Sequence, residues 1–196
     1  MDAKSLLQFM EQVGRMKVMP RTGWLLRGVK HPETVAEHSY RMTLLAMVLS
    51  DMLNEQGLVI NVERVMRMAL LHDIAESQTG DIPQPAMRHF PDEVKENVER
   101  GIMTELTQDF GHLGNLYVDL WEEYERSETL EAQIVKTADK LELLIQAFEY
   151  EKLGFQSLDD FWENLLSYPL FQDYPLVQQV LILLAERRLR LPFRHQ

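Results

Sequence analysis

Residues 70–76 read Leu-Leu-His-Asp-Ile-Ala-Glu and bring ionisable side chains onto the apolar face of a predicted helix. Upstream, Val65 and Ala69 mark an apolar stripe at helical spacing, and His72, Asp73 and Glu76 continue that stripe. Burying carboxylates without partners is costly, so this trio requires a cation, a hydrogen-bond network or an open cleft. For an isolated His-Asp pair the alternative is a hydrogen-bonded core histidine beside a capping carboxylate.

A second predicted helix also carries an inward-facing histidine. His38 lies on the same side as Met42, Leu45 and Leu49, and it falls in the first turn of that helix. The positive end of the helix dipole disfavours a protonated imidazole there. This permits the neutral ring that metal binding requires, but it does not decide the role of His38.

Asp139 stands in a third helix that is apolar on more than one side, which is typical of a central helix. Val135 and Leu143 lie four residues to either side of it. An inward carboxylate is one interpretation, and a solvated aspartate beside Lys136 and Lys140 is the other. Periodicity alone does not choose between them.

The whole chain predicts an all-α fold, because apolar residues recur at three- and four-residue steps and strand-like alternation is nearly absent. Thr34 and Glu37 form a capping-box pattern, and the prolines within residues 80–85 predict a stiff loop there. We expect one compact bundle of about 7–9 helices over residues 1–196. The predicted helices, to within about 2–4 residues at each end, are 3–18, 35–55, 62–77, 91–109, 113–126, 129–152, 158–167 and 175–190.

Composition excludes several classes of protein. The 196 residues are 45% hydrophobic and include no cysteine, so disulfide scaffolds, thiolate metal sites and cysteine nucleophiles are excluded. The net charge of -11 disfavours general binding to nucleic acid polymers. No apolar run approaches the roughly 20 residues of a membrane span, so a cytoplasmic protein without membrane contact is expected.

Four motifs occur in a characteristic order. They are Glu-Thr-Val-Ala-Glu-His at 33–38, Leu-Leu-His-Asp-Ile-Ala-Glu at 70–76, Thr-Gly-Asp-Ile-Pro at 79–83 and Val-Lys-Thr-Ala-Asp-Lys at 135–140. Their combination resembles the HD-domain phosphohydrolase superfamily. Pro-Arg-Thr-Gly-Trp at 20–24 and Trp-Glu-Glu-Tyr-Glu at 121–125 resemble its 5'-deoxynucleotidase branch. The motif-bearing core spans about residues 5–155, and the C-terminal helices follow at 156–196.

This resemblance implies a single HD domain that binds a divalent cation through His38, His72, Asp73 and Asp139. Manganese, cobalt, iron, zinc and magnesium all suit such a sulfur-free ligand set. The implied reaction is the hydrolysis of deoxyribonucleoside 5'-monophosphates to deoxynucleoside and orthophosphate. Because the family often dimerises, the implied partners are a small nucleotide and a second copy of the chain.

The resemblance also implies roles around the cation. Glu76 would orient or deprotonate the attacking water, and Arg21 would orient the phosphate, with Asp73 as a third catalytic residue. The residues implied to contact the substrate are Arg21, Trp24, His38, Asp73, Asp81, Ile82, Pro83 and Gln84. A second cation is implied near Glu76, Asp81 and the Ile82 backbone. The residues alone leave other interpretations open: Glu76 as a hydrogen-bond partner, Arg21 as a surface residue and Trp24 as core.

Two alternative functions remain at this point. One is an HD-domain phosphohydrolase that acts on a nucleoside triphosphate, an alarmone or a cyclic nucleotide. The other is a helical adaptor without catalysis, although all four implied ligand positions are filled. The remaining histidines match no motif position, and we expect them to be structural or exposed; they are His31, His89, His112 and His195.

Overall fold

The computed structural model describes residues 2–166 and 168–192, and within them it contains eleven α-helices, three 3-10 helices and no strand. The helices are α1 Ala3–Val13, α2 Thr22–Leu25, α3 Val35–Glu55, α4 Val62–Leu71, α5 Glu76–Thr79, α6 Gln84–Met87, α7 Asp92–Thr107, α8 His112–Arg126, α9 Leu130–Lys152, α10 Asp159–Leu166 and α11 Pro175–Leu189. The all-α prediction is confirmed. The count exceeds 7–9 because α2, α5 and α6 are single turns of four residues.

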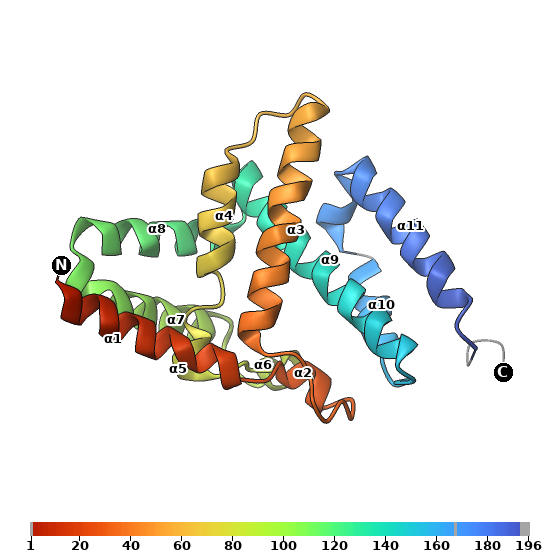
Figure 1. The fold of residues 1–196 in the computed structure, drawn as a ribbon, viewed down its shortest axis with the longest axis horizontal. Helices are drawn as coiled ribbons and strands as arrows, with labels where there is room; N and C mark the ends of the chain where they lie inside the picture. Colours follow the sequence, from red (N-terminus) through yellow and green to blue (C-terminus); the bar gives the residue numbers. More distant parts are fainter. Residues whose placement is uncertain (1, 167, 193–196) are drawn as a thin grey trace.

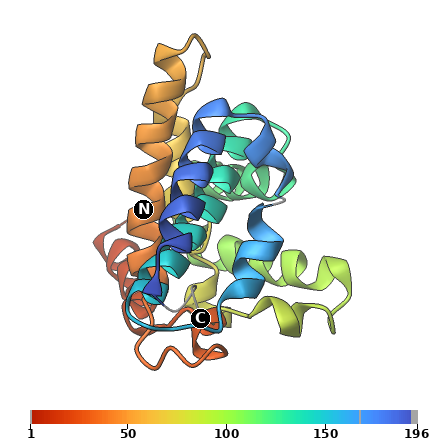
Figure 2. The same ribbon diagram turned by 90° about the vertical axis from the view of Figure 1, so that its right-hand side faces the viewer.

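Helices α3, α4 and α9 form the centre of the molecule (Figure 1). Helices α1, α7 and α8 lie on one side of them, and α10 and α11 pack on α9 at the other (Figures 1 and 2). Two apolar clusters match this division. The larger joins α3, α4 and α9 to the C-terminal helices, and the smaller lies between α1, α7 and α8. The polar motifs fall where the central helices converge.

Local signals explain where α3 begins. Thr34 accepts from the backbone N–H of Glu37, and the Glu37 carboxylate accepts from the backbone N–H of Thr34 at 2.7 Å, so the predicted capping box is present. Just upstream, Pro20 and Thr34 form an isolated antiparallel bridge. The bridge ties the segment that carries Arg21 to the start of α3.

The predicted helix 62–77 is wrong at residues 72–75, since α4 ends at Leu71 and α5 begins at Glu76. Beyond it the backbone bonds tighten from four-residue to three-residue spacing, as in Ile74 to Leu71 and Ser77 to Ile74. The predicted loop 80–85 is wrong in its last two residues, because α6 begins at Gln84. Pro85 fits the first turn of α6, because backbone N–H groups in that turn have no acceptor within the helix and proline, which lacks an N–H, loses nothing there. The predicted end of a helix at 167 lies outside the described residues.

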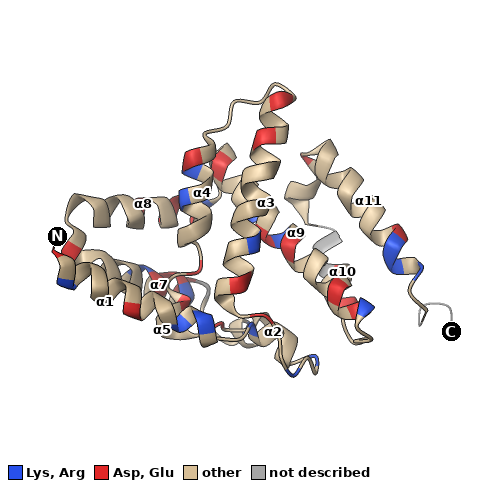
Figure 3. Ribbon diagram, viewed as in Figure 1, with Lys and Arg blue, Asp and Glu red and all other residues tan. Residues whose placement is uncertain are grey.

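Acidic and basic residues are interspersed along the helices (Figure 3), and no single basic face is visible in this view. Within residues 2–166 and 168–192, no helix combines the length and apolar character that crossing a membrane requires. His31, His89 and His112 are exposed, as expected, whereas His195 lies outside the described residues.

Candidate metal centre

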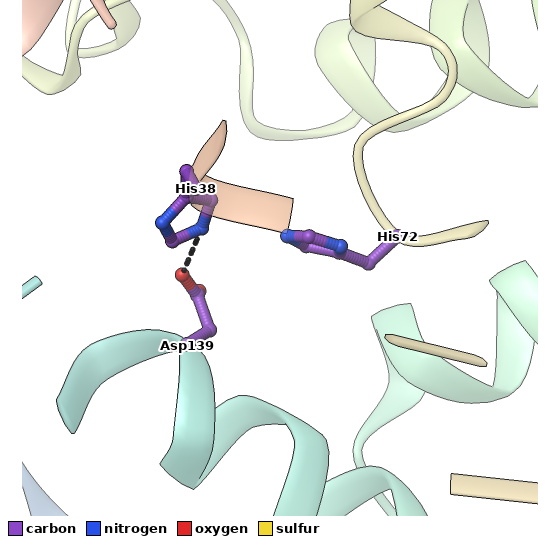
Figure 4. A group of neighbouring side chains, drawn as sticks. All are labelled: His38, His72 and Asp139. Atoms are coloured by element: carbon purple, nitrogen blue, oxygen red, sulfur yellow. Dashed lines mark ion pairs between the residues drawn. The ribbon is translucent and has the colours of Figure 1, made fainter. Parts of the chain in front are cut away.

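Three separate parts of the fold deliver His38, His72 and Asp139 to one point (Figure 4). His38 comes from the first turn of α3, His72 directly follows α4, and Asp139 comes from the middle of α9. One donor atom from each lies within 4.8 Å of the others, and all three residues are buried. With 4% of its surface exposed, Asp139 is not a solvated aspartate, so that alternative interpretation is wrong.

Asp73 lies beside this group rather than inside it. Its Oδ2 is 3.0 Å from His72 Nε2 and 4.0 Å from His38 Nε2. The tightened turn after α4 places the adjacent His72 and Asp73 side chains on the same side of the chain. The four implied ligands are therefore neighbours in space.

The surroundings of the ring nitrogens and the carboxylate oxygen show whether these residues fit a cation. His38 Nε2, His72 Nε2 and Asp139 Oδ1 are buried, and none of them has a hydrogen-bond partner outside the acidic and imidazole groups of the site. His38 Nε2 lies 3.2 Å from Asp139 Oδ1, the ion pair drawn in Figure 4. The other ring nitrogen of each histidine is engaged: His72 Nδ1 is 2.7 Å from the Ala69 carbonyl, and His38 Nδ1 is 2.6 Å from Glu142. A proton on each Nδ1 leaves both Nε2 lone pairs facing the Asp139 carboxylate. The donor set therefore fits a divalent cation.

Neighbouring charges shift the pKa values of the buried His38 and Asp139. Burial and Arg21 lower the pKa of His38, but its bonds to Asp139 and Glu142 outweigh them and raise this pKa to about 9. Burial opposes ionisation of Asp139, yet Lys140 and His38 hold its pKa well below the usual range. Without a cation, a protonated His38 thus offsets part of the acidic charge.

Arg21 brings a fixed positive charge to the same place. Its Nη1 is 3.1 Å from Asp73 and 3.7 Å from both Glu76 and Asp81. The Arg21 side chain is largely buried, so the interpretation as a surface arginine is wrong. Burial and the Asp73 charge raise the pKa of Glu76 to about 9. A protonated Glu76 is the expected form before a cation binds.

A cavity of about 490 Å³ opens from this site. The residues implied to contact the substrate line it, except for His38, which lies behind the wall. Trp24 is only 1% exposed, donates from Nε1 to Glu33 and stacks on Phe161 with 4.2 Å between ring centroids. Trp24 thus belongs mainly to the core and reaches the cavity at its wall. Asp81 Oδ2 accepts from the backbone N–H and the hydroxyl of Thr22.

Sequence reasoning missed two charged residues of α9. Glu142 accepts from His38 Nδ1, and Lys140 Nζ lies 2.8 Å from Asp139 Oδ2 while also lining the cavity. Glu142 stands three residues after Asp139 on a helix with apolar neighbours at Leu141 and Leu143. A buried position for it was therefore detectable, but its contact with α3 was not.

Residues 13–166 match the family model described as HD domain. The chain is similar to the 5'-deoxynucleotidase HDDC2 of Homo sapiens, with 42% identity over 94% of this chain and 87% of the relative. It is also similar to the 5'-deoxynucleotidase hdd1 of Schizosaccharomyces pombe, with 37% identity over 87% of this chain and 86% of the relative.

Solved structures agree in fold. A conserved hypothetical protein from Pyrococcus furiosus superposes with a TM-score of 0.79 and 33% identity, over 92% of this chain and 99% of that one. A predicted metal-dependent phosphohydrolase from Magnetospirillum magnetotacticum gives a TM-score of 0.73 and 26% identity, over 95% of this chain and 92% of that one.

Proposed function

Since the chain belongs to the HD-domain family, we propose that it is a metal-dependent 5'-deoxynucleotidase. It hydrolyses deoxyribonucleoside 5'-monophosphates to deoxynucleoside and orthophosphate. The names of the relatives, which cover most of the chain, support this substrate class.

The observation that carries the proposal is the convergence of buried potential ligand atoms from His38, His72 and Asp139 on one point beside a cavity. We assign His38, His72, Asp73 and Asp139 as ligands of a divalent cation, with manganese or cobalt as the first candidates. When bound, the cation supplies Lewis-acid polarisation of the phosphoryl group and lowers the pKa of water.

The chain's own residues then bind and orient the substrate. Arg21 faces the cavity next to Asp73, and its planar guanidinium can hold two phosphate oxygens at once. Binding a phosphate there lets Arg21 exchange carboxylate contacts for phosphate contacts while it stays charged. The cavity wall formed by Ile82, Pro83 and Gln84 accommodates the nucleoside, with Asp81 towards the sugar.

Glu76 is the residue that we propose moves a proton. Its Oε2 is buried and has no hydrogen-bond partner. A nearby divalent charge favours the ionised carboxylate and so lowers the raised pKa of Glu76. The ionised Glu76 can accept a proton from the attacking water, and it can return that proton to the departing 5' oxygen.

Further parts of the proposal concern the whole protein. We propose one HD domain over residues 1–196, located in the cytoplasm, that acts as a homodimer. Exposed apolar side chains on α11, at Ile182, Leu183 and Leu189, support a contact between two copies. A second cation near Glu76, Asp81 and the Ile82 backbone is also proposed, although Arg21 Nη1 lies 3.7 Å from both carboxylates.

A panel of phosphate esters tests the activity. The purified full-length chain is incubated with manganese or cobalt and with deoxynucleoside and ribonucleoside monophosphates, nucleoside triphosphates, an alarmone and cyclic nucleotides. We expect orthophosphate only from the deoxynucleoside 5'-monophosphates. Glu76→Gln should lower turnover by about 100-fold or more, the usual effect of removing a positioned acid-base group.

Other outcomes identify the rival functions. Release of pyrophosphate or triphosphate would assign the chain to another branch of HD-domain phosphohydrolases. Absence of turnover with every cation, together with absence of bound metal in elemental analysis, would mean that the chain is a helical adaptor.

A further inference from the structure

His38 presents its two ring nitrogens to two different surroundings. Its Nε2 faces the candidate metal centre, whereas its Nδ1 lies 2.6 Å from Glu142 Oε2 on the opposite side of the ring. Both side chains have no exposed surface. The short contact between α3 and α9 therefore lies behind the centre, away from the substrate cavity.

Glu142 is itself held from the other side. Its Oε1 accepts from Arg41 Nε at 2.7 Å, and Arg41 also donates to Gln146 and Glu149 further along α9. Because Arg41 Nη2 lies 2.5 Å from the same Oε1, the carboxylate is clamped between imidazole and guanidinium. Both oxygens are occupied, so the orientation of Glu142 is fixed.

This arrangement has a consequence for the histidine. When a cation is bound, the imidazole of His38 is neutral, carries one proton and binds the cation only through the nitrogen that lacks the proton. A carboxylate that accepts from Nδ1–H keeps the proton there, leaves the Nε2 lone pair free and makes it more basic. Glu142 would thus select the tautomer of His38 that the metal centre needs.

The same residues offer a competing interpretation. Glu33, His38 and Glu142 also bring donor atoms within 4.8 Å of one another, as a cation site on the Nδ1 side would require. However, Glu33 Oε1 already accepts from Trp24 Nε1, and Glu142 is engaged by His38 and Arg41. A cation there would have to break these bonds, which favours a supporting role for Glu142.

We propose that Glu142, clamped by Arg41, is a positioning residue that holds His38 with its proton on Nδ1 and thereby strengthens cation binding at Nε2. The inference rests on the proposed function only through the metal centre. It does not depend on which phosphate ester is hydrolysed.

Metal affinity provides the test. Mn²⁺ binding to the full-length protein is measured by competition with a fluorescent chelator for the wild type, Glu142→Gln and Glu149→Gln. The two variants make the same chemical change on the same helix and against the same arginine, but only Glu142 touches His38. We expect Glu142→Gln to weaken Mn²⁺ binding by about 10- to 100-fold and Glu149→Gln to change it by less than about 3-fold.

A spectroscopic readout separates positioning from general damage. Nitrogen NMR of the histidine rings in the Zn²⁺-loaded protein should show His38 protonated at Nδ1 in the wild type. In Glu142→Gln we expect a mixture of tautomers or loss of zinc from His38. If Glu142→Gln fails to fold, Arg41→Met releases the clamp from the partly exposed end, and we expect it to weaken Mn²⁺ binding by about 3- to 10-fold.

The outcomes distinguish this inference from the proposed function. Equal Mn²⁺ affinity in wild type and folded Glu142→Gln, with an unchanged His38 tautomer, overturns the positioning role alone. If Glu142→Gln does not fold, an Mn²⁺ affinity of Arg41→Met equal to that of the wild type also overturns the positioning role alone. A wild type that binds no divalent cation instead overturns the metal centre.

Discussion

Arg21 is the residue that we propose binds the substrate phosphate. Its guanidinium contacts Asp73 and lies near Glu76 and Asp81, yet it faces the cavity. A charged hydrogen bond contributes about 1.5–3 kcal/mol. We expect Arg21→Met to lower kcat/KM for a deoxynucleoside monophosphate by about 10- to 100-fold, mainly through KM, in steady-state phosphate release.

Arg67→Met is the matched control for this change. Arg67 is an exposed arginine on α4 that pairs with Glu63, outside the cavity. Arg67→Met should leave kcat/KM and KM within about 2-fold of the wild type, because surface ion pairs contribute little. Unchanged kinetics in Arg21→Met would mean that the phosphate is held elsewhere.

Local and distant interactions differ in how well the sequence predicts them. The capping box of Thr34 and Glu37 is a contact between residues three apart, and α3 begins where this pattern predicts. The end of α4 is not predictable from the same apolar periodicity, because a change to three-residue hydrogen bonding alters that spacing very little. Glu142 escapes prediction for another reason: its partner His38 is 104 residues away in the chain.

The candidate site shows the same contrast. Motif resemblance selects His38, His72, Asp73 and Asp139, and the structure brings these residues together. Trp24 is different, because its only side-chain hydrogen-bond donor, the indole N–H, donates to Glu33 and not to a ligand in the cavity. Tertiary packing of this kind has no signature in the spacing of residues 20–24.

Helix α7 carries a buried carboxylate that makes folding stability depend on pH. Burial outweighs the opposing charge of Lys95 and raises the pKa of Glu99 from 4.5 to about 7. The folded state therefore binds this proton more tightly than the unfolded state. Ionisation of the buried Glu99 therefore lowers the free energy of unfolding. This loss of stability is absent below about pH 4.5, grows as pH rises and is nearly complete above about pH 7.

Glu99→Gln should remove this dependence. We expect the variant, relative to wild type, to gain about 2 kcal/mol more in unfolding free energy at about pH 8 than at about pH 5. Urea unfolding of the metal-free protein at both pH values measures the difference. Glu105→Gln, an exposed change on the same helix, should show no such difference. A parallel response of both variants would contradict the assignment to burial.

The position of the metal centre links it to the stability of the entire fold. His38 lies on α3, His72 directly follows α4, and Asp139 lies on α9, the three elements at the centre of the molecule (Figure 1). A cation bound by all three stabilises only the folded state, because the unfolded chain does not bring these residues together. Binding should therefore appear in thermal unfolding even in the absence of substrate.

The expected effect follows from mass action. At a free cation concentration about 100 times Kd, binding adds about 2.7 kcal/mol, which corresponds to a rise in Tm of roughly 5–10 °C for a chain of this length. Calorimetry with and without Mn²⁺ measures the rise, and a chelator should reverse it. Asp139→Asn should abolish the rise, whereas the exposed His112→Ala should retain it. A rise of equal size in Asp139→Asn would show that Mn²⁺ binds outside the convergence of α3, α4 and α9.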